Sequence, residues 1–233
     1  MIHRNGVYTE YRDPEGVPEA SVQLETEGYA LLQGVFSTEA VGVLAADIDR
    51  VFAEFPADGR AKNRSAEEDA MFRYEMLNRS EVSQQAVAHP EILKVIEPLI
   101  GEDCHVIANT AWRNTVVPEW THGGGHWHID AGPHVPLPAG VSWPLDIPHP
   151  VFAIGVHIFL KDCDQDDGPT GVIPGSHLSG QAPPRERIMD PDLSWQGRGA
   201  VSLLAKAGDV ALFVSDVWHR RMPTDRKSTR LNS

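Results

Sequence analysis

The segment GGGHWHID, residues 123–130, places three glycines before a short run in which possible metal ligands alternate with apolar residues. Side chains at positions i, i+2 and i+4 of a β-strand point to one face. In a strand, His126, His128 and Asp130 would share a face, and each offers an atom that can bind a metal ion. The glycines allow a tight turn and leave space beside this face. The segment therefore predicts a metal-binding strand that a histidine from elsewhere must complete.

The composition indicates a single folded domain and argues against nucleic acid and membranes as partners. The chain has 233 residues, of which 41% are hydrophobic and 23% charged, which is enough for a buried core. The formal net charge of −13 opposes binding to nucleic acid or to an anionic membrane. We see no bilayer-length apolar run and no signal-peptide centre near the N-terminus. Cys104 and Cys163 are expected to be free thiols of a reducing compartment, so we expect a cytoplasmic protein.

The N-terminal third has the pattern of helices, and the rest has the pattern of strands. Ser37 is a suitable N-cap, the apolar residues after it follow helical spacing, and Pro56 ends the pattern. A shorter helix is indicated between Pro90 and Gly101. From about residue 104, short segments rich in β-branched and aromatic residues are separated by Gly, Pro and Asp. This order predicts a mainly β protein with N-terminal helices, a sandwich or jelly roll.

The best candidate for the second histidine is His219, which closes the segment DVALFVSDVWH (209–219). We expect this segment to be one apolar strand that ends at His219. The residue follows His128 by 91 positions, a separation that a jelly roll bridges easily because distant strands lie adjacent in it. Two histidines and one carboxylate form a facial triad that holds Fe(II), and zinc accepts the same ligands, usually with a fourth. Taken alone, His219 is better explained as a strand-end histidine that caps a loop.

A third segment, DDGPTGVIPGSH (166–177), puts two tight turns around a short apolar strand. Together with HWHID and the segment that ends at His219, it resembles the phytanoyl-CoA dioxygenase family of Fe(II)- and 2-oxoglutarate-dependent oxygenases. Members of that family show a His-x-Asp, a Gly-Pro…Pro-Gly-Ser-His segment and a distal histidine in this order. Residues 27–52 also resemble the opening strand and helix of the family. The resemblance covers roughly residues 24–224.

The resemblance implies a double-stranded β-helix, the cupin-like jelly roll, with iron at one open end. It assigns Fe(II) to His128, Asp130 and His219, with 2-oxoglutarate and O₂ at the remaining positions. The implied reaction hydroxylates a small organic substrate and releases succinate and CO₂. Asp130 favours hydroxylation, because related halogenases lack this carboxylate. His126 and Trp127 are assigned to the rim of the site or to a supporting role behind the ligands.

Two further histidines and one segment are expected to have roles other than metal binding. His157 lies inside an apolar segment and is expected to be a core histidine, and His177 closes a turn and is expected to be structural. Residues 130–150, rich in proline and aromatic residues, are expected to form a lid beside the metal that sets substrate specificity.

Two alternatives from other classes are open to the same residues. HWHID also resembles the His-x-His-x-Asp-His zinc motif of metallo-β-lactamase-type hydrolases, although Ala131 stands where that motif has a further histidine. The second alternative is a non-catalytic, cupin-like protein that binds a small molecule. Iron-dependent consumption of 2-oxoglutarate separates the three hypotheses, because only the oxygenase shows it.

The last nine residues, DRKSTRLNS (225–233), match the translation of a common sequencing-library adapter. Arg230 falls eleven positions after His219, about where the family places the arginine that binds 2-oxoglutarate, but we do not assign it that role. We expect one oxygenase domain in residues 1–224, a non-native tail after it and a jelly roll truncated at its C-terminal end. We expect such a chain to be poorly soluble, to bind 2-oxoglutarate weakly and to be inactive itself. The sequence indicates neither the oligomeric state nor the identity of the substrate.

Overall fold

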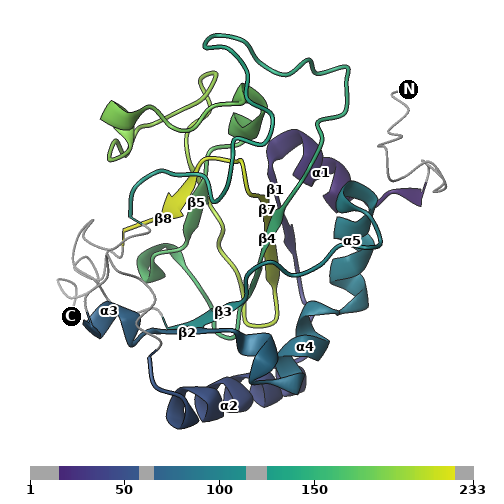
Figure 1. The fold of residues 1–233 in the computed structure, drawn as a ribbon, viewed down its shortest axis with the longest axis vertical. Helices are drawn as coiled ribbons and strands as arrows, with labels where there is room; N and C mark the ends of the chain where they lie inside the picture. Colours follow the sequence, from purple (N-terminus) through teal and green to yellow (C-terminus); the bar gives the residue numbers. More distant parts are fainter. Residues whose placement is uncertain (1–15, 58–65, 114–124, 224–233) are drawn as a thin grey trace, which may run out of the picture.

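A computed structural model describes residues 16–57, 66–113 and 125–223, and within them helices flank antiparallel strands (Figure 1). The α-helices are α1 (Glu19–Glu27), α2 (Thr38–Glu54), α3 (Ala66–Asp69), α4 (Glu81–Val87) and α5 (Pro90–Ile100). The strands are β1 (Tyr29–Leu32), β2 (Phe72–Tyr74), β3 (Thr110–Trp112), β4 (Ile154–Ile158), β5 (Thr170–Val172), β6 (Val201–Ser202), β7 (Val210–Val214) and β8 (His219–Arg221). Short 3-10 helices are η2 (Met76–Asn78), η3 (Gln165–Asp167), η4 (Ser176–Ser179) and η5 (Arg185–Arg187).

The strands form two three-stranded sheets and one separate pair, and every pairing is antiparallel. The first sheet has the order β1-β7-β4 and the second has the order β6-β5-β8, while β2 pairs with β3. β5 and β8 lie beside the first sheet, on the side away from α5 (Figure 1). The first sheet is therefore the middle layer between the helices and the second sheet.

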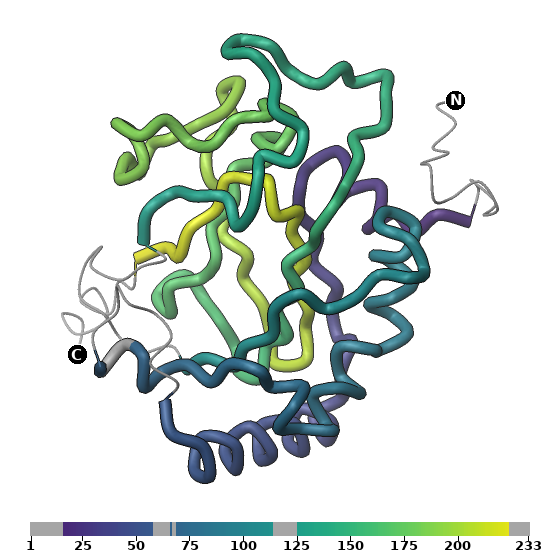
Figure 2. The backbone as a smooth tube through the Cα atoms, in the orientation of Figure 1, coloured from purple at the N-terminus to yellow at the C-terminus, as the bar shows by residue number. Residues whose placement is uncertain are grey.

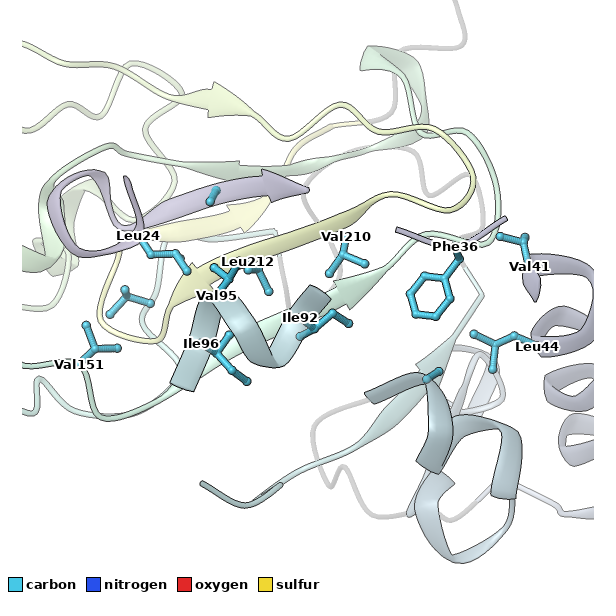
Figure 3. Packing of buried hydrophobic residues seen from close by; sticks show 13 residues of the cluster. Leu24, Phe36, Val41, Leu44, Ile92, Val95, Ile96, Val151, Val210 and Leu212 are labelled. Atoms are coloured by element: carbon cyan, nitrogen blue, oxygen red, sulfur yellow. The ribbon is translucent and has the colours of Figure 1, made fainter. Parts of the chain in front are cut away.

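Strand β7 is buried on both faces because it runs through this middle layer. Its alternating residues Val210 and Leu212 face α1, α2 and α5 and join a cluster with apolar residues of these helices (Figure 3). Ala211 and Phe213 point the other way and pack with Val172 of the second sheet. The period-2 alternation of a pleated strand thus serves two separate apolar layers.

The two helices predicted from the sequence are confirmed. α2 begins after Ser37, whose side chain accepts a hydrogen bond from the backbone N–H of Ala40 at 3.2 Å. α5 begins at Pro90 and ends before Gly101, which has a φ of 94°. Proline fits the first turn because that turn lacks a partner for its N–H, and glycine tolerates a positive φ beyond the helix end.

One predicted strand is wrong in its extent. The apolar segment expected to end at His219 is interrupted: β7 ends at Val214, residues 215–218 form a turn, and His219 begins β8. The Ser-Asp pair at the break is typical of turns, since both side chains bond to nearby backbone. The HWHID segment likewise is not a regular strand, since its bridge to β8 is a single residue pair, His128 with His219.

Some predictions fall outside the described ranges. These concern Gly123 and Gly124, and the tail at 225–233 with Arg230. Among the described helices, none has the length and apolar character needed to cross a membrane.

The middle position of β7 predicts a large loss of stability when its core is truncated. Leu212 is fully buried and lies between Ala30 of β1 and Val156 of β4. Leu212→Ala should lower the free energy of unfolding by about 2–5 kcal/mol, because it leaves a cavity that the flanking layers cannot close. Urea denaturation followed by circular dichroism measures this. The same change at Leu145, which is 84% exposed, should cost less than about 0.5 kcal/mol; equal losses in the two variants would contradict the layered core.

Candidate metal centre

The centre is built on the backbone bridge between His128 and His219. The N–H of each residue donates to the carbonyl oxygen of the other, both at 3.0 Å. Residues directly opposite in an antiparallel pair project their side chains to the same side, and the centroids of the two imidazole rings are 4.4 Å apart. Asp130 follows two residues later and donates its own N–H to the carbonyl oxygen of Ser215 at 3.1 Å.

The carboxylate of Asp130 lies beside the Nε2 atoms of both histidines. Its Oδ1 is 3.4 Å from Nε2 of His219 and 4.0 Å from Nε2 of His128. One possible ligand atom from each residue lies within 4.8 Å of the others. The structure therefore brings together all three residues that the sequence nominated, and it is the one such cluster of three found among the described residues.

The other ring nitrogen of each histidine is bonded to a backbone carbonyl. Nδ1 of His128 lies 2.8 Å from the carbonyl oxygen of His126, and Nδ1 of His219 lies 2.9 Å from that of Val217. A carbonyl oxygen can only accept, so Nδ1 carries the proton in each ring and Nε2 keeps its lone pair. This donor set suits a divalent metal ion, since ligating histidines usually donate their second N–H to such a partner.

The charges of the group also suit a metal. Burial, followed by the effect of His219, lowers the pKa of His128. Burial alone would raise the pKa of Asp130, but the hydrogen bond and charge of His219, with smaller effects of His128 and His157, lower it below its ordinary value. At neutral pH the pair is therefore a neutral imidazole and a carboxylate, the protonation states that metal binding requires.

The two residues that precede His128 in the chain have different places in the structure. His126 supports the centre through its carbonyl oxygen, and its ring centroid lies 5.3 Å from that of His128. Trp127 is 1% exposed, packs with Ile173 and Trp218, and donates its indole N–H to the carbonyl oxygen of Asp190 at 2.8 Å. Its ring therefore belongs to a neighbouring apolar cluster that supports the ligand-bearing segment from behind.

Phe213 of β7 forms the floor of the centre. It lies opposite Gly155 of β4, where a Cβ atom would come within 2.5 Å of its ring, so only glycine leaves room for this ring. The centroid of the Phe213 ring is 4.8 Å from that of His219 and 4.9 Å from that of His157. The Phe213 ring thus links the candidate ligand His219 to the first sheet, which contains β7.

His157 belongs to the wall of the centre, which the sequence reasoning missed. Its ring contacts Phe213 on one side and Trp112 on the other, with centroids 4.9 and 4.8 Å away. Burial, with His219 adding to it, lowers the pKa of His157 to about 4, so the ring is neutral. The alternation of side chains along the strand could have indicated this role. Val156 and Ile158 pack toward the helices, so His157, which lies between them, must face the opposite side.

The segment 130–150 is attached to the turn between β7 and β8 at its near end. In Figure 2 it is the long teal excursion at the top of the view. The N–H of His134 donates to Oδ2 of Asp216 at 2.8 Å, and Nδ1 of its ring lies 2.6 Å from Oδ1. Gly132 has a φ of 106°, and a Cβ atom there would lie 3.0 Å from Oδ1 of Asp216. Asp216 itself is buried, so this is a fixed contact.

The far end of the segment 130–150 contacts Glu25 of α1 and the ring of His177. The N–H of His149 donates to Oε1 of Glu25 at 3.1 Å, and the His149 ring meets Trp143 and His177 edge-on. Nε2 of His177 lies 2.9 Å from the carbonyl oxygen of Glu25, in line with the structural role expected for His177. The segment is therefore held at both ends.

Two facing antiparallel sheets around two histidines and one carboxylate define the class of mononuclear, non-haem iron oxygenases. The family model described as phytanoyl-CoA dioxygenase (PhyH) matches residues 24–224. The chain belongs to the phytanoyl-CoA dioxygenase family. This confirms the predicted family and enzyme class, an Fe(II)- and 2-oxoglutarate-dependent dioxygenase, and it removes the zinc hydrolase alternative.

The individual proteins to which this chain is similar agree with this family assignment. The ectoine dioxygenase of Bordetella bronchiseptica is 24% identical over 239 residues, an alignment that covers 91% of this chain and 72% of that protein. The apo structure of EctD from S. alaskensis superposes with a TM-score of 0.70 at 20% identity, covering 94% of this chain and 76% of the other. HygX from Streptomyces hygroscopicus, solved with nickel and 2-oxoglutarate, gives a TM-score of 0.61 at 16% identity, with 89% and 82% covered. These likenesses confirm the predicted jelly-roll fold.

The buried histidine His149 predicts a dependence of stability on pH. Its Nδ1 is buried without a hydrogen-bond partner among the described residues, and burial, with His177 adding to it, lowers its pKa to about 4. The unfolded chain protonates first as pH falls, so stability is full above about pH 6.5 and declines toward pH 4, by on the order of 3 kcal/mol for this residue. His149→Phe should flatten this decline in the metal-free protein, and the decline that remains comes from the other groups of shifted pKa, His157 and His128 among them.

Urea denaturation between pH 4 and 7 measures the decline. His105→Phe is the matched control, because His105 is exposed and its replacement should leave the slope unchanged. A His149→Phe variant with the wild-type slope would contradict the buried, neutral state of His149.

Proposed function

We propose that this protein hydroxylates a small organic substrate, with Fe(II) bound by His128, Asp130 and His219 and with 2-oxoglutarate and O₂ as cosubstrates. Residues 1–224 act as one oxygenase domain in this proposal. The supporting observation is the convergence of two Nε2 atoms and one carboxylate oxygen, 3.4 and 4.0 Å apart at the bridge between HWHID and β8. The family assignment supplies the reaction class.

Iron held by these three residues would supply the reduction of O₂ coupled to oxidative decarboxylation of 2-oxoglutarate to succinate and CO₂, with the second oxygen atom entering the substrate as hydroxyl. A set of only three protein ligands would leave room at the metal for the cosubstrates. The carbonyl groups of His126 and Val217 hold the two imidazole rings in the metal-binding tautomer. Phe213, which is buried against the ring of His219, excludes water from the floor.

The chemistry of the segment 130–150 indicates the kind of substrate. This segment contains no lysine or arginine, whereas a CoA phosphate site needs cations. Its exposed apolar side chains include Val141, Leu145 and Ile147. Relatives named ectoine dioxygenase act on a small molecule by name. We infer a small substrate with an apolar part, which is held beneath this segment and is not an acyl-CoA ester.

Removal of the carboxylate tests the ligand set. Asp130→Ala should weaken Fe(II) binding by more than roughly 100-fold, since loss of a supporting partner alone costs about 10–100-fold. Calorimetric titration of Fe(II) under anaerobic conditions measures this independently of turnover. Asp103→Ala removes an exposed carboxylate and should bind iron as wild type does. An Asp130→Ala protein with wild-type affinity would show that the ligand set is wrong.

Cosubstrate binding tests the reaction class. Anaerobic addition of 2-oxoglutarate to the Fe(II) protein should produce a visible charge-transfer band, and admission of air should then release succinate. The zinc-loaded protein should give neither signal and should not hydrolyse ester or β-lactam probes. A wild-type Fe(II) protein without a band, even at high 2-oxoglutarate, and without succinate in air would sink the proposal. The non-catalytic, cupin-like alternative predicts that outcome.

A further inference from the structure

Aromatic rings form a continuous chain from the candidate ligand His219 to the surface of the protein. The ring centroids of His219 and Phe213 are 4.8 Å apart, and those of Phe213 and His157 are 4.9 Å apart. The His157 ring in turn meets the ring of Trp112 in β3 edge-on at 4.8 Å. Each separation is that of a direct tilted or edge-to-face contact between rings. Phe213 is buried and Trp112 is 42% exposed, so this ring chain joins the metal group to solvent.

Of the rings in this chain, the indole of Trp112 gives up an electron most readily. A benzene ring and a neutral imidazole are much harder to oxidise, so Phe213 and His157 can serve as a bridge but not as the place where an electron is lost. Because the side chain of Trp112 is exposed, water can reach it and take up the protons that an oxidised indole releases. The chemistry of the ring chain therefore makes its outer end the site of oxidation.

The tryptophans that adjoin the candidate ligands in the sequence are less suited to this role. Trp127 and Trp218 are 1% and 5% exposed, so water hardly reaches them. The guanidinium carbon of Arg220 also lies 5.2 Å from the centroid of the Trp127 ring, and a positive charge there opposes the loss of an electron. Among these three tryptophans, Trp112 combines a ring path to a ligand with access to water.

We propose that Trp112 is an oxidation site that protects the metal centre when O₂ and 2-oxoglutarate are consumed without substrate, an inference that rests on the proposed function. Such a turnover gives succinate and CO₂ and leaves one oxygen atom, which needs two electrons and two protons to become water. Trp112 supplies both electrons through His157 and Phe213. Its ring loses one C–H hydrogen as a proton and binds the hydroxyl of a solvent water, whose other proton is released. The product is hydroxytryptophan, and the ligand side chains are spared.

Trp143 offers a matched control within the same protein. Its ring also meets a histidine edge-on, His149 at 5.2 Å, and that histidine meets His177 at 5.1 Å. Among the described residues, this second chain of rings makes no ring contact with a candidate ligand. Trp143 is partly exposed. A diffusible oxidant would therefore attack both tryptophans, whereas oxidation through ring contacts with His219 reaches Trp112 alone.

Peptide mass spectrometry after turnover without substrate tests the proposal. The Fe(II) protein is incubated with 2-oxoglutarate and O₂, without added reductant, in water labelled with heavy oxygen, and succinate is measured in parallel. Trp112 should gain one oxygen atom that carries the solvent label, and Trp143 should stay unmodified. Unlabelled oxygen on Trp112 would show that the atom comes from O₂ by direct attack, and equal oxidation of the two tryptophans would show a diffusible oxidant. Either result would overturn the proposal.

Variants that break the ring chain separate electron transfer from simple exposure. Phe213→Leu and His157→Leu each remove one ring of the chain, and either should lower the oxidation of Trp112 per succinate several-fold. The second variant serves where the first folds poorly. Trp112→Phe changes an exposed residue and should shift oxidation to the peptides that carry the ligands, with faster inactivation in turnover without substrate. Trp143→Phe should inactivate at the wild-type rate.

Each contrary result has a distinct meaning. Unchanged oxidation of Trp112 per succinate in a folded Phe213→Leu or His157→Leu protein would overturn the ring path. Oxidation at Tyr29 instead, which lies opposite Phe213 in the β1–β7 pair, would overturn Trp112 as the site. Succinate release with Trp112 unmodified would overturn this inference alone. A wild-type protein that releases no succinate and shows no charge-transfer band would overturn the proposed function together with it.

Discussion

The pair of backbone hydrogen bonds between His128 and His219 is the contact on which the centre depends. It joins segments 91 residues apart and places two imidazole rings on one side of the chain. Each ring is then oriented by the carbonyl two residues before it, from His126 and from Val217. Because the ligand set is oriented by backbone, its geometry depends on the chain path and only weakly on the neighbouring side chains.

The bridge is held in place by the layered core around β7. This strand is buried on both faces, with the helices on one side and the second sheet on the other. Phe213, on the second face, reaches both His219 and His157 through ring contacts. Gly155 is required opposite this ring because any side chain would occupy its place. The floor of the centre is thus one face of the hydrophobic core, which fixes its position and keeps it dry.

The sequence predicted the features that residues close together in the chain determine, and it missed the features that depend on strand pairing. The caps at Ser37 and Gly101 act within a single helix turn, so the helix bounds followed from them. The three candidate ligands were nominated from their residue types, the spacing of His128 and Asp130 and the order of the family motifs, and the structure brings them together. The break after Val214 and the start of β8 at His219 depend on which strand each residue meets, and no local pattern determines that.

The turn at 215–218 links the segment 130–150, the candidate metal ligands and the start of β8. The carbonyl of Ser215 accepts the N–H of Asp130, the carboxylate of Asp216 holds His134, and the carbonyl of Val217 orients His219. The segment 130–150 is therefore anchored to the same turn that holds Asp130 and His219 in place. A packed turn keeps one arrangement, so the positions of this segment and of the two candidate ligands are set by one stretch of backbone.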